Sequence, residues 1–344
     1  MSTQLRAMLE KLLKRENLTE DEAASLLNEL TDATLAPPLA GALLIALRAK
    51  GETAEELRGF ARAMRSLALQ PKLPPGEPTV DVVGTGGDAS GSLNISTGAA
   101  LLAAACGLRV VKHGNRSVSS RSGSADTLEA LGLKLPLDAV EAGACLAATG
   151  FTFLFAPHYH PATKAIAQVR SALGVRTVFN LLGPLSNPAA PPFSLVGAFN
   201  LLAAELMADA FAGMPIERVM VIHGEPGWDE ATPAGPFHVF DVRPGRVSRS
   251  LRHASLYGIE ACETHDLAGG DAQYNAMRLK DALEGRERGA HRDAIVLETA
   301  LVLELMGKES EPRAAAATAA RAIDDGRAAK LLAALVRFSK EVRS

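Results

Sequence analysis

The chain of 344 residues has little cysteine and almost no net charge, and both shortages exclude whole classes of protein. Its three cysteines, Cys106, Cys145 and Cys262, form no CxxC pair and are odd in number. This excludes a disulfide scaffold and favours a reduced, intracellular protein. The net charge is −3, so the chain as a whole gives no electrostatic pull toward nucleic acid or a membrane surface.

Long hydrophobic segments are also missing. The longest apolar run, residues 99–107, is far shorter than the roughly 20 residues that a membrane-spanning helix needs. The N-terminal MSTQLRAMLEKLLKRE is charged within its first turns and lacks the apolar stretch of a signal peptide. We therefore expect a cytoplasmic protein. Apolar residues make up 47% of the chain and charged residues 22%, a balance that supports a globular interior.

The pattern of elements predicts an α/β protein with a helical start. Residues 1–70 show only helical periodicity, with Thr19 and Thr53 as caps and Pro38 in a first turn. A linker with four prolines, residues 71–78, ends this region. Short apolar strands then alternate with helices, which favours a mostly parallel central sheet flanked by helices. The predicted strands are residues 80–83, 109–111, 151–155, 194–199 and 219–222, with a late antiparallel pair at 237–242 and 246–251.

The first segment with chemical character is DVVGTGGD at residues 81–88. A strand leads into a glycine-rich turn and then a helix, so backbone N–H groups can gather around a phosphate. The segment is neither a dinucleotide fingerprint nor a Walker A loop, and a plain tight turn remains an alternative. Asn94, Ser96 and Thr97 follow at the start of an apolar helix. They are predicted to cap that helix, and as a binding site they would contact phosphate and give one hydroxyl to Mg²⁺.

The most informative segment is KHGNRSVSS at residues 112–120, which follows a predicted strand. It combines two cations, a glycine, an amide and three hydroxyls in nine residues, a mixture that suits a diphosphate and that a solvated loop does not require. We expect it to form a polar loop that moves together with the glycine turn. Ser124 is expected to cap the next helix and to add a donor.

The order of these motifs resembles anthranilate phosphoribosyltransferases over nearly the whole chain. GTGGD, NIST, KHGNRSVSS and GSAD are followed by Ala156-Pro157, His160-Pro161-Ala162, VRSALGVRTVFNLLGPLSNP at 169–188, His223-Gly224 and Asp229-Glu230. The resemblance implies transfer of the phosphoribosyl group of 5-phosphoribosyl 1-diphosphate to the amine of anthranilate, in tryptophan biosynthesis. It also implies two Mg²⁺ per active site and a homodimer formed through a helical domain. That domain would comprise residues 1–70 and part of 170–190, beside an α/β domain at 78–344.

The resemblance also implies a set of site residues. For the ribosyl diphosphate these are Gly84, Gly87, Asp88, Ser92, Asn94, Ile95, Ser96, Thr97, Lys112, His113, Gly114, Asn115, Arg116, Ser117, Val118, Ser119, Ser120 and Ser124. For anthranilate they are Gly84, Asn115 and Arg170, with Arg170 facing the carboxylate and His160, Gly183 and Pro184 lining the channel. For magnesium they are Ser96, Asp229 and Glu230. No acid, base or nucleophile is identified, and none is required, because the aromatic amine is already a neutral nucleophile.

Other interpretations stay open for single residues. Asp229-Glu230 alone is typical of an exposed acidic pair and Arg170 of a surface arginine, while His158 and His160 lack a third zinc ligand nearby.

Two positions depart from the family pattern. ATPAGP stands at 231–236 instead of Ile-Ser and a Leu-Thr-Gly-Pro stretch, and Glu298-Thr299-Ala300 stands where Asn-Ala-Ala is usual, so we expect altered support near the site.

Two other functions are compatible with parts of the sequence. A pyrimidine nucleoside phosphorylase would use free phosphate and a nucleoside, but the acidic pair and the complete KHGNRSVSS segment argue for a diphosphate with two metals. A non-catalytic nucleic-acid binder would require a basic surface stripe, against which the net charge of −3 argues.

Overall fold

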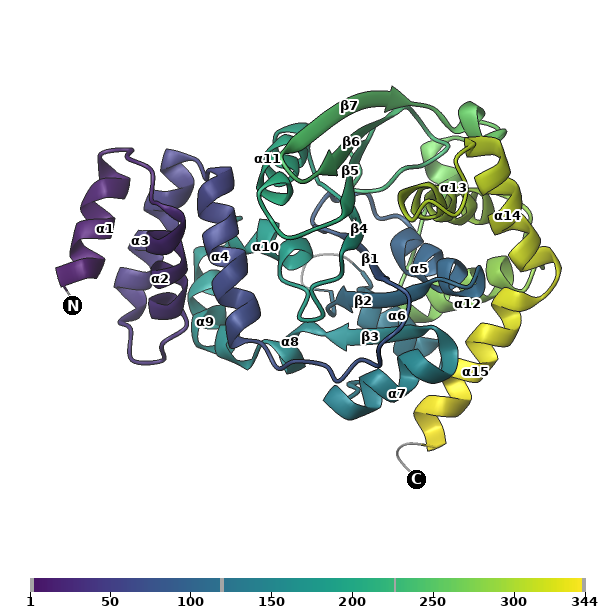
Figure 1. The fold of residues 1–344 in the computed structure, drawn as a ribbon, viewed down its shortest axis with the longest axis horizontal. Helices are drawn as coiled ribbons and strands as arrows, with labels where there is room; N and C mark the ends of the chain where they lie inside the picture. Colours follow the sequence, from purple (N-terminus) through teal and green to yellow (C-terminus); the bar gives the residue numbers. More distant parts are fainter. Residues whose placement is uncertain (1–2, 118–120, 226, 342–344) are drawn as a thin grey trace.

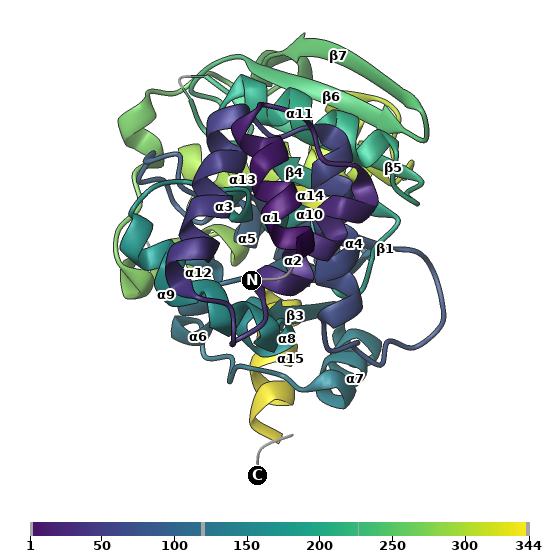
Figure 2. The ribbon, with the colours of Figure 1, turned by 90° about the vertical axis from the view of Figure 1, so that its left-hand side faces the viewer.

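The computed structural model describes residues 3–117, 121–225 and 227–341. Three predicted site residues, Val118, Ser119 and Ser120, lie outside these ranges. Four helices form the N-terminal end of the molecule (Figures 1 and 2): α1 Thr3–Leu13, α2 Glu20–Leu30, α3 Pro37–Lys50 and α4 Ala54–Leu67.

The ends of these helices follow from local sequence. Thr19 and Thr53 cap α2 and α4, each in a reciprocal capping box with a glutamate three residues later. Pro37 and Pro38 occupy the first turn of α3, where a missing N–H costs nothing. All three predicted helix starts are confirmed.

Within the described residues, seven strands form one sheet in the order β3-β2-β1-β4-β5-β6-β7. The first five strands in sequence pair in parallel and β6 and β7 are antiparallel, as predicted. The strands are β1 Thr79–Gly84, β2 Arg109–Gly114, β3 Phe151–Phe155, β4 Phe193–Gly197, β5 Arg218–Gly224, β6 Phe237–Arg243 and β7 Arg246–Arg252.

The prediction of a loop beginning at Lys112 is wrong for its first three residues. Lys112, His113 and Gly114 continue β2 and pair with β3. Lys112 and His113 are buried. Their polar side chains suggest a loop in the sequence, although the two residues lie in a central strand and pair with β3. Movement of the KHGN and GTGGD segments stays a prediction.

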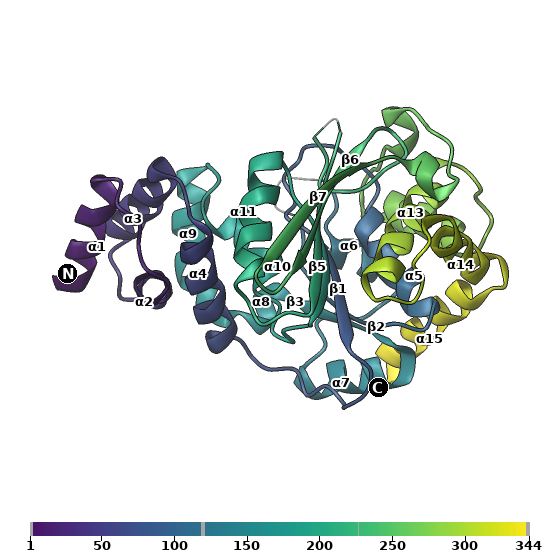
Figure 3. The same cartoon turned by 45° about the horizontal axis from the view of Figure 1, so that its top comes forward.

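Helices cover both faces of the sheet (Figure 3). Val82, Leu195 and Met220 belong to the buried cluster that includes α5, α13 and α14, whereas the adjacent Val83 and Val196 face the cluster that includes α4 and α11. This alternation is the two-residue period of strands buried on both sides. The remaining helices are α5 Ile95–Ala105, α6 Ser124–Ala130, α7 Ala139–Thr149, α8 Ala156–Tyr159, α9 Lys164–Leu173, α10 Phe179–Leu185, α11 Leu201–Ala212, α12 Ala272–Leu283, α13 Ala290–Leu305, α14 Pro312–Asp324 and α15 Arg327–Glu341, with 3₁₀ turns at Pro161–Thr163, Ala254–Tyr257 and Thr264–Leu267.

The segment after β3 returns to the N-terminal helices. α9 packs on α3 and α10 packs on α4, so Ile166 and Leu182 join the same buried cluster as Leu43 and Phe60. The α9–α10 segment thus lies between the helical end and the sheet (Figure 1). Among the described residues, no helix has both the length and the apolar character that crossing a membrane requires.

Close packing of α2 and α4 gives a stability prediction. A Cβ at Gly59 of α4 would overlap the carbonyl of Glu20 and lie 2.8 Å from the Cβ of Ala23. Gly59→Ala should therefore lower the free energy of unfolding by about 1–3 kcal/mol, measured by urea denaturation.

Gly41→Ala in α3 is the matched control, because a Cβ there would have its nearest neighbours at 3.8 Å. It should be neutral or stabilising by up to about 1 kcal/mol. Equal effects of the two substitutions would contradict the packing described.

Candidate active site

Segments following β1, β2 and β5 meet at the carboxyl ends of the parallel strands, where α/β proteins place their ligands. The glycine turn follows β1, the first turn of α5 lies beside it, and Asp229-Glu230 follow β5. Residues distant in sequence are therefore joined by direct hydrogen bonds.

The glycine turn takes its shape from its own backbone and from Asp229. Gly86 and Gly87 have φ of 68° and 73°, a left-handed conformation that favours glycine. A Cβ at Gly84 would collide with the carboxylate of Asp229. The N–H of Gly86 donates to Asp229 Oδ2 at 2.6 Å. Glycine is thus required at Gly84 because a Cβ has no room there, and at Gly86 and Gly87 because φ is positive.

Asp229 lies buried between this turn and a second carboxylate. Its backbone N–H donates to Asp88 Oδ2 at 3.3 Å, and the hydroxyl of Thr85 donates to its side chain at 3.4 Å. Burial, reinforced by the negative charge of Asp88, raises the pKa of Asp229 to about 7. The alternative of an ordinary exposed acidic pair is wrong, because only 8% of Asp229 and 6% of Glu230 is exposed.

The side chain of Glu230 lies against the first turn of α5. Its Oε1 accepts from the N–H of Ser96 at 3.1 Å and its Oε2 from the hydroxyl of Ser92 at 3.0 Å. Burial, together with the charges of Glu298 and Asp229, raises the pKa of Glu230. A carboxylate at a helix N-terminus is favoured by the helix dipole.

Asn94 occupies the predicted N-cap position of α5, and its carbonyl accepts from the N–H groups of Thr97 and Gly98, but its side chain makes no hydrogen bond to the first turn. The Asn94 amide instead donates to the carbonyl of Ser122 at 3.1 Å, and its oxygen accepts from Thr127 at 2.6 Å and Asn275 at 2.8 Å. It therefore joins α5 to the segment before α6 and to α12.

Lys112 is a buried cation in this mostly acidic surrounding. Its Nζ donates to the carbonyl of Val82 and lies 3.4 Å from Ser96 Oγ. Burial lowers the pKa of Lys112, and the charges of Asp81 and Glu298 oppose that shift. Asp81, whose pKa burial raises to about 6, accepts from Asn187 at 2.8 Å and from the N–H of His113 at 3.2 Å. Sequence reasoning missed Asp81 and Asn187, since their partner strands are remote in sequence.

Glu298, one of the two departures from the family pattern, lies against the acidic loop. It projects from α13, is 1% exposed, and its Oε1 accepts from the N–H of Ala231 at 3.1 Å. Burial raises its pKa to about 8. This chain therefore places a third buried carboxyl next to Asp229 and Glu230.

The donor set fits a magnesium ion. Ser96, Asp229 and Glu230 offer the hard oxygens that Mg²⁺ prefers, and burial together with neighbouring carboxylates raises the pKa of both acids, a setting in which a bound cation would stabilise their charged forms. In the described ranges, no three His, Cys, Asp or Glu side chains are grouped to hold a metal by themselves. Mg²⁺ commonly takes one or two carboxylates together with phosphate oxygens and water.

A second group of predicted residues surrounds a pair of buried histidines. His113 Nδ1 donates to the carbonyl of Gly183 at 3.1 Å, and the ring of His160 lies edge-on to that of His113 with centroids 5.1 Å apart. Burial lowers the pKa of His113 to about 3 and that of His160 to about 4. Both rings are therefore neutral near pH 7, and Pro184 is buried beside Gly183 in α10.

Arg170 is placed on α9 with its guanidinium 4.8 Å from the ring centroid of Phe179, and burial lowers its pKa. None of the interactions found within the described residues joins it directly to Asn115 or Gly84. The predicted cap at Ser124 is wrong: Gly123 precedes α6, and the Ser124 hydroxyl donates to the carbonyl of Asn115 at 3.2 Å.

Sequence reasoning also missed Arg176. Its guanidinium stacks 4.1 Å from the ring centroid of Phe199 and donates to the carbonyl of Gly87, while its own carbonyl accepts from Arg48 of α3. Arg176 thus connects the glycine turn to the helical end. In the sequence, the only feature that could have indicated Arg176 is that it is a second arginine near Arg170. The other predicted residues Ile95 and Thr97 are buried in α5, and Ser117 lies three residues after the end of β2.

Comparison with known proteins agrees with this geometry. Residues 6–68 match the helical bundle domain of a glycosyl transferase family and residues 76–329 match its a/b domain. An anthranilate phosphoribosyltransferase of Desulforudis audaxviator is 43% identical over 340 residues, covering 98% of this chain and 97% of that protein.

Solved structures extend the likeness to the fold. The anthranilate phosphoribosyltransferase of Thermus thermophilus superposes with a TM-score of 0.90 at 39% identity, covering 97% of this chain and 99% of that one. The Saccharomyces cerevisiae enzyme in complex with PRPP and Mg gives a TM-score of 0.90 at 25% identity, covering 99% of both chains. The same yeast enzyme has been solved with 4-fluoroanthranilate. Full-length likeness in sequence and fold shows that this chain belongs to the anthranilate phosphoribosyltransferase family.

Proposed function

We propose that this chain transfers the phosphoribosyl group of 5-phosphoribosyl 1-diphosphate to the amine of anthranilate, giving N-(5-phosphoribosyl)anthranilate and pyrophosphate for tryptophan synthesis. One observation carries the proposal: the Asp229-Glu230 pair is buried and hydrogen-bonded to both the glycine turn and the start of α5. The yeast relative that binds PRPP, Mg and an anthranilate analogue supports the choice of substrates.

The donor would lie at the carboxyl ends of β1 and β2. Backbone N–H groups of the glycine turn, the hydroxyls of Ser92 and Ser96 and the charge of Lys112 suit the phosphate oxygens. Magnesium, two ions per site in this proposal, would be held by Ser96, Asp229 and Glu230 and would offset the charge that grows on departing pyrophosphate. The further donor contacts predicted from the sequence, Arg116 excepted, are proposals on the same basis.

The acceptor would enter from the side of α9 and α10. Arg170 would face its carboxylate, Asn115 and Gly84 would contact the ring and amine, and His160 with Gly183 would form the wall. The neutral state of His113 and His160 suits a wall that does not compete with Arg170 for the carboxylate. Because the aromatic amine needs little deprotonation, catalysis would come from positioning and electrostatics, with no general base.

Domain boundaries, oligomeric state and location belong to the same proposal. We place the helical domain at residues 1–70 with part of 170–190 and the α/β domain at 78–344. The protein would act in the cytoplasm as a homodimer formed through the helical domain. Leu13 and Ile45 of that domain are 63% and 39% exposed, and apolar side chains of this kind suit a subunit contact.

Turnover should depend on the buried acidic pair. With ribosyl diphosphate, Mg²⁺ and anthranilate, loss of anthranilate fluorescence should report the reaction. Asp229→Asn should lower kcat/KM by about 100-fold or more, because it removes charge that balances the metal at the leaving group.

Arg170→Ala is the comparison variant for that assay, since it should raise the KM for anthranilate and leave binding of the ribosyl diphosphate intact. A folded wild-type protein that binds the donor without consuming anthranilate would overturn the choice of acceptor. Full activity of Asp229→Asn would overturn the assigned role of the acidic pair.

The buried carboxyls also predict how stability depends on pH. A carboxyl whose pKa is higher in the folded than in the unfolded protein binds its proton more tightly when folded, so stability falls as pH rises toward the folded value. Glu298, with a pKa of about 8, should make the free energy of unfolding fall between pH 5 and pH 8 without Mg²⁺. Glu298→Gln should reduce that fall, measured by urea denaturation at several pH values.

Exposed Glu10 of α1 supplies the control, and Glu10→Gln should leave the pH profile unchanged. A Glu298→Gln protein with the wild-type profile would show that Glu298 is ionised without cost in the folded state, contrary to its burial.

A further inference from the structure

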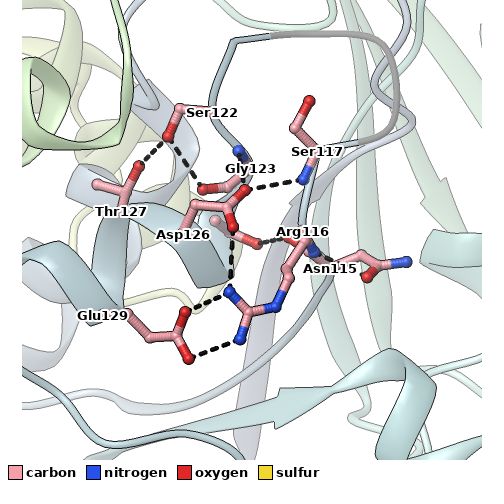
Figure 4. Close-up of polar contacts among 9 residues, drawn as sticks. Asn115, Arg116, Ser117, Ser122, Gly123, Asp126, Thr127 and Glu129 are labelled. Carbon is pink, nitrogen blue, oxygen red and sulfur yellow. Dashed lines mark hydrogen bonds and ion pairs between the residues drawn. The ribbon is translucent and has the colours of Figure 1, made fainter.

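Arg116, two residues after the end of β2, contacts two carboxylates of α6 (Figure 4). Its Nη2 donates to Glu129 Oε1 at 2.7 Å, and its Nη1 donates to Glu129 Oε2 and lies 3.3 Å from Asp126 Oδ1. The guanidinium also lies 5.5 Å from the ring centroid of Phe155. Two parallel hydrogen bonds to one carboxylate form the most specific ion-pair geometry available to arginine.

The same helix holds the backbone next to Arg116. Asp126 Oδ2 accepts from the N–H groups of Ser117 and Gly123, each at 2.9 Å (Figure 4). Asp126 therefore fixes backbone at two positions while its other oxygen faces Arg116. The contact between the end of β2 and α6 is a network and not a lone surface ion pair.

The charge of this network is unfavourable for a direct role of Arg116 at a diphosphate. One positive charge faces two negative charges, so the cluster has no surplus attraction for an anion. Withdrawal of Arg116 would leave two adjacent carboxylates with only 24% and 28% of their side chains exposed. The two negative charges of Asp126 and Glu129 would then repel each other, which opposes the withdrawal of Arg116.

The network does bear on Asn115, the proposed contact of the acceptor. The N–H of Arg116 donates to Asn115 Oδ1 at 2.7 Å, and the carbonyl of Asn115 accepts from Ala125 and Ser124, both at 3.2 Å. The Asn115 side chain is thus hydrogen-bonded to the backbone of Arg116, the residue whose guanidinium pairs with Glu129.

We propose that Arg116 is a positioning residue that, through its bidentate pair with Glu129, fixes Asn115 for the acceptor, and that it does not ligate the diphosphate. The inference rests on the proposed function and replaces the diphosphate contact that the resemblance implies for Arg116. Glu129, which sequence reasoning did not single out, becomes its functional partner.

A double-mutant cycle tests the proposal on the full-length enzyme. Arg116→Met, Glu129→Gln and the double variant are each measured for the KM for anthranilate and, by calorimetry with Mg²⁺, for the Kd for the ribosyl diphosphate. Each single variant should raise the KM for anthranilate about threefold to tenfold, and the double variant should raise it no further, because both lose the same pair. The Kd for the ribosyl diphosphate should stay within about twofold of wild type, since coupling through this pair does not reach that ligand.

Arg121→Met is the reference, because Arg121 is exposed on the same segment and its loss measures the effect of one charge alone. Thermal unfolding verifies that each variant is folded, and Glu129→Gln keeps the shape of the side chain.

Three results would overturn the proposal. A Kd for the ribosyl diphosphate that rises tenfold in Arg116→Met and not in Glu129→Gln would make Arg116 a diphosphate ligand. Tighter binding of the ribosyl diphosphate by Glu129→Gln would show that Glu129 competes with the diphosphate for Arg116. If the effects of the two single substitutions on the KM for anthranilate multiply in the double variant, Arg116 and Glu129 have independent roles. A wild-type protein that binds the ribosyl diphosphate without turnover defeats the proposed function alone, and the Kd comparison still decides whether Arg116 is a diphosphate ligand.

Discussion

The rest of the site depends on the burial of carboxyl groups at the carboxyl ends of the parallel strands. Asp229, Glu230 and Glu298 are buried close together, with Lys112 as the buried cation beside them. Burying charge without compensation is costly, so the protein distributes backbone N–H groups and hydroxyls around these oxygens. The same excess of negative charge suits the proposed metal-bound diphosphate better than a bare anion.

The fold provides the rigidity that this arrangement requires. Both faces of the sheet are covered, by α11 on one side and by α5 and α13 on the other, and α5 and α13 each hold part of the site. α5 presents the N–H of Ser96, and α13 presents Glu298. Arg176 then connects the glycine turn to the helical end, so the proposed acceptor and donor sides share one support.

Sequence patterns predicted the elements well because local signals define them. The caps at Thr19 and Thr53 and the antiparallel pair β6–β7 follow from residues within a few positions of one another. The mistakes arise where a partner is remote. Lys112 and His113 are expected in a loop because a local pattern does not reveal their partner Asp81, which lies in another strand. Asn94 holds the N-cap position of α5, but the carboxylate that accepts from the N–H of Ser96 is Glu230, from a distant loop. The contacts that the resemblance implies with substrates and metal remain predictions, since geometry alone places residues and not ligands.

The most direct test of the account is calorimetric titration of Mg²⁺ into the protein with and without 5-phosphoribosyl 1-diphosphate. If the buried carboxyls and the diphosphate share the metal, Mg²⁺ should bind weakly alone and about tenfold or more tightly with the ribosyl diphosphate present. By linkage, Mg²⁺ should raise the affinity for the ribosyl diphosphate by the same factor. Asp229→Asn should abolish most of that coupling. Equal Mg²⁺ affinity with and without the ribosyl diphosphate would contradict the claim that the acidic pair and the diphosphate form one metal site.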